Sequence, residues 1–162
     1  MEISIKECTI NDIDNVYQIG IDTFIEQWEE LMPKSELDLC LKEYFNKDNI
    51  INDFILNNTI YFIITNNDKI AGFSKIINKD YERIELSKFY ILKEYHGKGI
   101  AYKLMDYLIE YYKEKKVIEL ESYKYNDRAN SFYKKYGFVK TRDCIFKVDL
   151  IEYEDEIYEK YL

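Results

Sequence analysis

A strand, a glycine turn, a helix and a second strand follow one another between residues 84 and 122, and this succession restricts the fold more than any other feature. Residues 84–92 and 117–122 are apolar runs of the kind found in buried strands. The helix between them carries apolar residues at three- and four-residue spacing: Ala101, Leu104, Met105, Leu108, Ile109 and Tyr112. A strand–helix–strand unit predicts two parallel strands joined by a right-handed crossover.

The turn inside this unit has the composition of an anion-binding site. It reads His96-Gly97-Lys98-Gly99-Ile100-Ala101 and holds two of the five glycines of the chain. Glycine lets the backbone approach a ligand closely, and the first N–H groups of a helix attract phosphate oxygens. The turn alone is a weak signal. Tyr102 stands where a dinucleotide-binding GxGxxG motif needs a small residue, and a GxxxxGK[ST] loop is absent.

The N-terminal half predicts mainly helices followed by a hairpin. Ile3 and Ile5 alternate with polar residues as in a short strand, and the sequence from Thr9 to Asp12 resembles a capping box that opens a first helix. A second helix is expected from residue 35, with a short separate helical piece around Ile51. Apolar runs at residues 61–64 and 70–77 then predict two antiparallel strands.

The C-terminal part adds a helix that begins after Asn126 and ends at Gly137, and then two closing strands at residues 138–148 and 156–162. The predicted order is β-α-α-β-β-β-α-β-α-β-β. The fold class is therefore α/β, with one mixed, mostly antiparallel sheet and helices on both faces.

Length and composition limit the classes of function. With 162 residues, 47% of them hydrophobic, we expect a single domain over residues 1–162. The net charge of −8 argues against nucleic acid as a partner. Three scattered cysteines without metal-ligand spacing indicate neither disulfides nor a metal site, and no apolar segment indicates membrane insertion or secretion. We expect a cytoplasmic protein; its oligomeric state stays open, and a homodimer is compatible with the sequence.

A second block of sequence identifies the family that the chain resembles. The glycine turn matches the signature Gln/Arg-x-x-Gly-x-Gly/Ala at Gly99 and Ala101, with His96 in the Gln/Arg position. The second block matches Asn-x-x-Ala-x-x-Phe-Tyr-x-x-x-Gly-Phe at Asn126, Ala129, Phe132, Tyr133, Gly137 and Phe138. Together with the order of elements over essentially the whole chain, the two blocks resemble the GNAT N-acetyltransferase superfamily.

The resemblance implies a GNAT-like fold, acetyl-CoA as co-substrate and no metal. Backbone N–H groups of the turn 96–101 would hold the pyrophosphate, and His96 in place of Gln or Arg would supply one side-chain bond fewer to it. The strand residues Phe89, Tyr90 and Ile91 would lie along the pantetheine arm, with backbone atoms of Phe89 and Ile91 pairing with it as with an added strand. Asn126 would bond to the same arm, and Ala129 and Phe132 would line the coenzyme A wall.

Tyr133 would be the general acid that protonates the departing thiolate. A thiol with a pKa of about 8.5 and a phenol with a pKa of about 10 are close enough in acidity for this proton transfer. The alternative is a core aromatic residue on its helix. With 17 tyrosines in the chain this alternative is strong for any tyrosine, but weaker for one at this motif position.

The acceptor amine also needs a base, because a primary amine with a pKa of about 10.4 is almost wholly ammonium at neutral pH. Alternation along the strand before the turn predicts that Glu85, Ser87 and Phe89 share one face. Glu85 is the first candidate, directly or through water, and Glu121 is the second. A solvated surface carboxylate is the alternative for both.

The sequence around Phe24 and Trp28 is similar to that of bacterial spermidine/spermine acetyltransferases of this superfamily, which makes these two residues candidates for substrate binding. The net charge and the carboxylates of Glu26, Glu29 and Glu30 favour a small cationic amine such as a polyamine, with a solvated helix end as the alternative for these carboxylates. Two alternatives stay open: a protein or peptide N-acetyltransferase, and a non-catalytic acyl-CoA-binding regulatory module.

Overall fold

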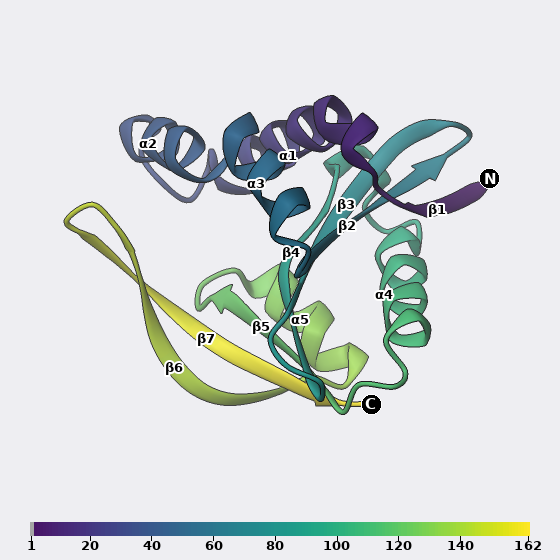
Figure 1. The fold of residues 1–162 in the computed structure, drawn as a ribbon. Helices are drawn as coiled ribbons and strands as arrows, with labels where there is room; N and C mark the ends of the chain where they lie inside the picture. The colour runs from purple at the N-terminus through teal and green to yellow at the C-terminus, as the bar shows by residue number, and fades with distance from the viewer. Residues whose placement is uncertain (1) are drawn as a thin grey trace.

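A seven-stranded sheet forms the centre of the computed structural model, which describes residues 2–162 (Figure 1). The strand order is β1-β2-β3-β4-β5-β7-β6. Every neighbouring pair is antiparallel except β4 and β5, which are parallel. The mixed, mostly antiparallel sheet and the parallel pair across the glycine turn are thus confirmed.

The strands are β1 (Ile3–Glu7), β2 (Thr59–Asn66), β3 (Lys69–Asn78), β4 (Arg83–Ile91), β5 (Val117–Tyr123), β6 (Val139–Val148) and β7 (Ile151–Tyr161). The helices are α1 (Ile13–Trp28), α2 (Lys34–Tyr44), α3 (Lys47–Leu56), α4 (Ile100–Tyr111) and α5 (Asp127–Tyr136), with short 3-10 turns η1 (Ile10–Asp12) and η2 (Lys93–Tyr95). None of these helices is long and apolar enough to span a membrane.

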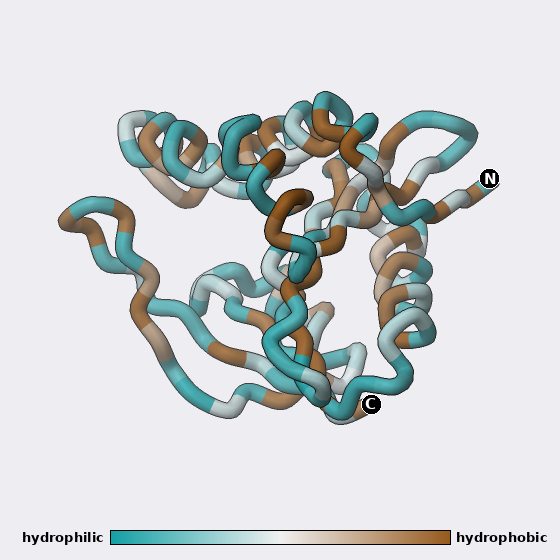
Figure 2. Tube along the Cα trace, in the orientation of Figure 1, coloured by the Kyte–Doolittle hydropathy of each residue, from teal (hydrophilic) through white to brown (hydrophobic). Residues whose placement is uncertain are grey.

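The helices cover both faces of the sheet, as predicted. On one face α4 and α5 bury a core around Phe62, Leu104 and Leu108, and on the other α1, α2 and α3 bury a core around Phe24 and Ile63. Hydrophobic and hydrophilic stretches alternate along each helix, which is the pattern of helices with one buried side (Figure 2).

Two predicted boundaries differ from the structure. Three helices rather than two precede β2, because the segment around Ile51 forms α3, a complete helix that Asn46 caps with a 2.9 Å hydrogen bond from the Asn49 N–H. Strand β7 begins at Ile151 rather than at residue 156. A tight turn with Asp149 at φ 54° joins it to β6, so pairing starts at once.

A β-bulge at Ser87 changes the direction of the side chains of β4. Lys75 of β3 lies opposite Lys88, whereas the next residue, Ile76, lies opposite Leu86, so Ser87 is an extra residue in its strand. As a result Leu86 and Phe89 both pack in the core beneath α4 and α5. The prediction that Glu85, Ser87 and Phe89 share one face is therefore wrong, because the bulge interrupts the alternation.

The close approach of β3 to β4 makes Gly72 sensitive to substitution. A Cβ added at Gly72 would lie 2.3 Å from the carbonyl oxygen of Tyr90 and 3.0 Å from the Cα of Ile91, so backbone would have to move. We expect Gly72→Ala to lower the free energy of unfolding by about 1–3 kcal/mol, measured by thermal and chemical denaturation.

Gly20→Ala is the matched control, because its added Cβ meets the Phe45 ring at 2.9 Å, a side chain that can rotate, and alanine favours the helix by about 1 kcal/mol. Equal stability of the two variants would show that the β3–β4 contact tolerates a methyl group.

Candidate active site

The parallel strands β4 and β5 part soon after they meet. Only Arg83, Ile84 and Glu85 of β4 pair with Val117, Ile118 and Glu119 of β5, although both strands continue. Beyond this point β4 stays paired with β3, and β5 stays paired with β7 along its whole length. The sheet therefore opens between β4 and β5, and the edge of β4 that faces the opening has no neighbouring strand.

The backbone of β4 presents hydrogen-bonding groups to this opening. The Leu92 N–H donates to the Ala71 carbonyl of β3 at 2.9 Å, so by alternation the groups of Phe89 and Ile91 point away from β3. The Ile91 carbonyl indeed receives a 2.7 Å hydrogen bond from His96 Nε2 on the open side. An extended ligand with amide groups can thus pair with β4 as an added strand.

The glycine turn ends in a helix with free N–H groups. Gly97 and Gly99 have φ angles of +74° and +75°, and Gly99 is the N-cap of α4 without a side chain to cap it. A Cβ at either glycine would meet no atom within 4 Å, so both face open space. The unsatisfied N–H groups and the helix dipole make this turn an anion cradle. Lys98 is exposed beside it, with its ammonium 5.4 Å from the Tyr95 ring.

His96 fixes this turn to its surroundings. Because Nε2 donates to the Ile91 carbonyl, Nδ1 is the acceptor of its hydrogen bond with Arg128 Nη1. Burial lowers the pKa of His96, which agrees with a neutral ring. His96 therefore positions Arg128, and the guanidinium brings a positive charge to the cleft where a histidine replaces the usual Gln or Arg.

A cleft of about 360 Å³ brings most of the predicted coenzyme residues together. It is lined by Phe89, Tyr90, Ile91, His96, Gly97, Gly99, Ile100, Ala101, Ala129 and Phe132, together with Gln27, Tyr95, Tyr102, Arg128 and Tyr133. The Phe89 and Phe132 rings stack there, 5.7 Å apart. The lining is apolar along the strand and polar at the turn, which suits a long ligand with a phosphate end.

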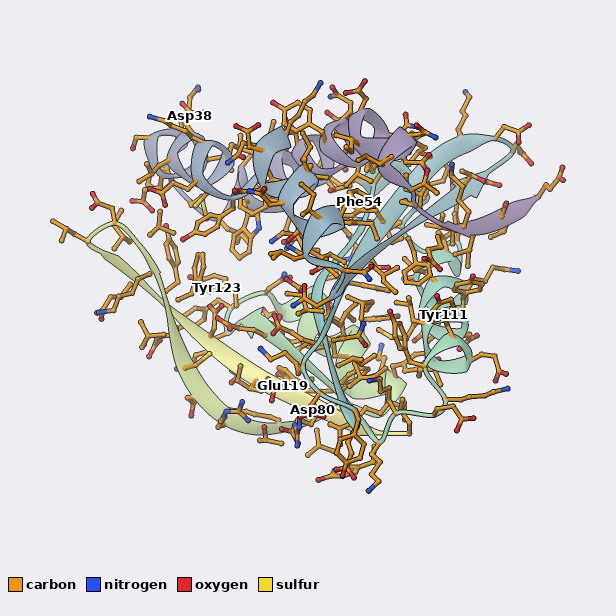
Figure 3. All side chains as sticks on the ribbon, in the orientation of Figure 1. Asp38, Phe54, Asp80, Tyr111, Glu119 and Tyr123 are labelled. Atoms are coloured by element: carbon orange, nitrogen blue, oxygen red, sulfur yellow. The ribbon has the colours of Figure 1, made fainter. Side chains whose placement is uncertain are left out.

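A second cavity, of about 340 Å³, adjoins the cleft. Phe24 and Trp28 of α1, the two residues predicted to bind substrate, line this cavity. Tyr123, which Figure 3 labels, stands at the end of β5, and its ring centroid lies 5.5 Å from that of Trp28. Tyr44 of α2 packs on Phe146 of β6 at 5.5 Å, and both line the cavity as well. The α2 helix and the β6–β7 hairpin thus touch beside it, so it is a pocket and not a wide groove.

Tyr133 lies where the two cavities meet. Residues that line both are Gln27, Phe89, Tyr90, Ala129 and Tyr133. The side chain of Tyr133 is buried, and burial raises the pKa of its phenol well above the ordinary value. The hydroxyl consequently stays protonated through the neutral range and is ready to donate.

Three predicted residues, Asn126, Glu85 and Glu121, line the second cavity and not the cleft at the glycine turn. Asn126 lines the second cavity, where its Oδ1 accepts a 3.3 Å hydrogen bond from the Ala129 N–H and caps α5, as predicted. Glu85 also lines the second cavity, but Lys79 Nζ lies 3.0 Å from its carboxylate. Glu121 lines the same cavity from β5.

Three charged residues of these cavities were not predicted: Arg128, Lys88 and Asp155. Arg128 stands inside the second motif block, so it was within reach. Lys88 was assigned no face, and the bulge at Ser87 decides its direction. Asp155 was outside the predicted last strand, so its pairing with Tyr123 was not foreseen.

The comparisons with known proteins agree with this geometry. The model of the acetyltransferase (GNAT) family matches residues 13–138, most of the chain. The protein is an acyltransferase, and it belongs to the GNAT family of N-acetyltransferases.

Solved structures that it resembles include the PaiA N-acetyltransferase from Thermoplasma acidophilum in complex with coenzyme A, at 19% identity and a TM-score of 0.79 over 100% of both chains. The spermidine N-acetyltransferase from Vibrio cholerae in complex with CoA and spermine has 18% identity and a TM-score of 0.73, over 98% of this chain and 95% of that one. The ribosomal-protein-S18-alanine N-acetyltransferase from Escherichia coli has 15% identity and a TM-score of 0.76, over 99% and 94%. At these identities the likeness shows the fold.

The open space at Gly99 gives a test of the anion cradle. Gly99→Val places a branched side chain where a phosphate would approach, and we expect it to weaken coenzyme A binding at least tenfold in calorimetry, a change of about 1.4 kcal/mol. Asp68→Val is the matched control, since Asp68 is exposed and also has a positive φ, of 63°, in the β2–β3 turn. Unchanged affinity in a folded Gly99→Val protein would contradict the assignment.

Proposed function

We propose that this protein transfers the acetyl group of acetyl-CoA to a primary amine by direct attack. The observation that supports the proposal most is the position of Tyr133, in the wall shared by a coenzyme-sized cleft and an aromatic pocket. A non-catalytic acyl-CoA-binding module would not need a buried phenol at this point.

The residues present fit coenzyme A. The N–H groups of the turn 96–101 and the Arg128 guanidinium would hold the pyrophosphate, with Lys98 adding charge at the rim. Backbone groups of Phe89 and Ile91 would pair with the pantetheine amides, while Ala129 and Phe132 pack against the arm. Acetyl-CoA, when bound, supplies an activated thioester carbonyl.

Tyr133 would give its proton to the sulfur as the carbon–sulfur bond breaks. In water the thiolate would need no help, but the buried pocket disfavours every anion, including the thiolate and the Tyr133 phenolate. Because burial raises the pKa of both groups, their difference in acidity stays small enough for proton transfer.

A polyamine is the acceptor class that we propose. Three carboxyl groups, those of Glu85, Glu121 and Asp155, line a pocket with aromatic walls, an arrangement that suits a cationic amine with an alkyl chain. Lys88 lines the same pocket, and burial lowers its pKa to about 8, so its positive charge is easier to remove than that of an ordinary lysine. The contact of α2 with the β6–β7 hairpin favours a small molecule over a protein acceptor.

Removal of the Tyr133 hydroxyl tests the proposed acid. We expect Tyr133→Phe to lower kcat about 10²-fold or more with nearly unchanged acetyl-CoA affinity, because the hydroxyl acts only as the sulfur leaves. Tyr136→Phe is the matched control: this tyrosine lies on the same helix, its hydroxyl bonds to Asp106, and it lines neither cavity. Wild-type turnover in Tyr133→Phe would assign the proton to water or another group.

An acceptor panel tests the substrate class. Release of free coenzyme A thiol is followed with spermidine, spermine, a neutral-chain primary amine, an amino acid and an alanine-terminated peptide. We expect the polyamines to be turned over fastest, with an apparent KM that rises with salt as the carboxylates are screened. Equal or faster turnover of the amino acid or the peptide would refute the polyamine assignment but leave acetyl transfer intact.

A further inference from the structure

Asp155 has a carboxyl oxygen that nothing in the described protein satisfies. The residue is only 9% exposed, and among residues 2–162 its Oδ1 has no hydrogen-bond partner. It lies on β7 and lines the second cavity, which is the proposed acceptor pocket. In the antiparallel register it lies opposite Tyr123 of β5. Buried polar atoms are nearly always hydrogen-bonded, so an unpaired oxygen in a pocket wall marks a place for a ligand donor.

A second carboxyl group lies beside it. Glu121 and Tyr123 alternate on β5 and so share the face on which Asp155 lies, and the Glu121 carboxyl is within hydrogen-bonding reach of Asp155. Two carboxyl groups can form a hydrogen bond with each other only when one of them is protonated. Burial, and then the neighbouring Glu121 carboxyl, raise the pKa of Asp155 well above the ordinary carboxyl range.

We propose that Asp155, with Glu121 beside it, is the proton acceptor for the attacking amine. This inference rests on the proposed acetyl transfer. The substrate ammonium donates to Asp155 and passes one proton to it, and the neutral nitrogen then forms its bond to the thioester carbon. The carbon–sulfur bond breaks, and the thiolate takes the Tyr133 proton. The amide forms with loss of a second N–H proton, which solvent returns to the phenolate, so one proton per ammonium is released overall.

The structure favours Asp155 over Glu85 for this step. The Glu85 carboxylate already has an ammonium partner in Lys79, and it belongs to the paired part of β4, where the strands have not yet separated. Asp155 belongs to the part of the sheet where they have separated, and its free oxygen needs a donor.

The other titratable groups around Asp155 have different pKa ranges. Burial raises the pKa of Tyr90 on β4 to about 12 and that of Cys144 on β6 to about 11, and it also raises the pKa of Tyr123 on β5 and of Tyr153 on β7. Lys88 on β4, which lines the same cavity, has a pKa that burial lowers to about 8. We therefore assign an acid limb below this range to Asp155, and the variants below test that assignment against Glu85.

The test is the pH profile of kcat/KM with spermidine for the wild type and for Asp155→Asn. We expect the variant to lose about 10²-fold at neutral pH, because its asparagine cannot take a proton. The loss should shrink as the pH approaches about 10.4, where a primary amine loses its own proton. Glu154→Gln is the control: it removes the neighbouring carboxylate, which bonds to Lys124 and Tyr125, and should keep the wild-type profile.

Glu121→Gln is a second variant, for which we expect a different change in the pH profile. Since Glu121 raises the pKa of Asp155, its removal should move the acid limb to lower pH without abolishing it. If Asp155→Asn lowers kcat/KM by the same factor at every pH, the proposal is overturned. A purely structural role would give such a constant loss, because it does not depend on the protonation state of the amine. Loss of the acid limb in Glu85→Gln but not in Asp155→Asn would overturn it as well.

An NMR titration of the side-chain carboxyl carbons, assigned with Asp155→Asn, separates this inference from the proposed function. A carboxyl that titrates well above about 3.9 and moves down in Glu121→Gln supports the inference. An ordinary pKa for Asp155 overturns it, whatever the activity. Failure of the wild type to acetylate any amine, with the raised pKa present, would refute the proposed function alone.

Discussion

The separation of β4 from β5 is the constraint on which the rest of the site depends. The two strands pair over three residues, and each then follows its antiparallel neighbour, β3 or β7. The bulge at Ser87 lies just beyond the last pair and bends β4 away. An exposed strand edge inside a sheet normally invites a further strand. Here the edge of β4 is instead free to pair with an extended ligand, and the opening leads from the glycine turn to the acceptor pocket.

The caps of two helices decide which end of the opening takes the anion. Helix α5 begins at Asn126, whose side chain satisfies the Ala129 N–H, whereas α4 begins at Gly99 and has no side-chain cap. The α4 end therefore leaves more N–H groups free for a phosphate than the capped α5 end. Arg128, held by His96, adds positive charge at the end with the glycine turn. The neutral His96 ring bonds to the Ile91 carbonyl of β4 and to the Arg128 guanidinium of α5, so it holds that guanidinium beside the turn. The second cavity, by contrast, contains the carboxyl groups of Glu121 and Asp155.

Local patterns were enough to predict the fold and to name most residues of the cleft at the glycine turn, but not the lining of the second cavity. The glycine turn and the block from Asn126 are each one continuous stretch of sequence. The neighbours of their residues in the structure could therefore be predicted from the sequence. The acceptor pocket combines side chains from α1, α2, β4, β5, β6 and β7, and its composition depends on register. A bulge of one residue at Ser87 reverses side-chain directions on β4, and the start of β7 decides that Asp155 faces Tyr123. Neither the bulge at Ser87 nor the start of β7 can be recognised from the hydrophobic periodicity of the sequence.

Acetyl transfer to an ammonium requires that the nitrogen lose a proton and that the departing sulfur gain one. Desolvation affects the groups that we propose for both steps. Burial raises the pKa of a phenol and of a carboxyl alike, since it disfavours either anion. For Tyr133, the proposed acid, this keeps the proton on the phenol at neutral pH. For Asp155, the proposed proton acceptor, it makes the carboxylate a stronger base than an ordinary one. Burial in the second cavity, between α1, α5, β4 and β7, therefore raises the pKa of both groups, and their proposed roles differ because a phenol is ordinarily a far weaker acid than a carboxyl.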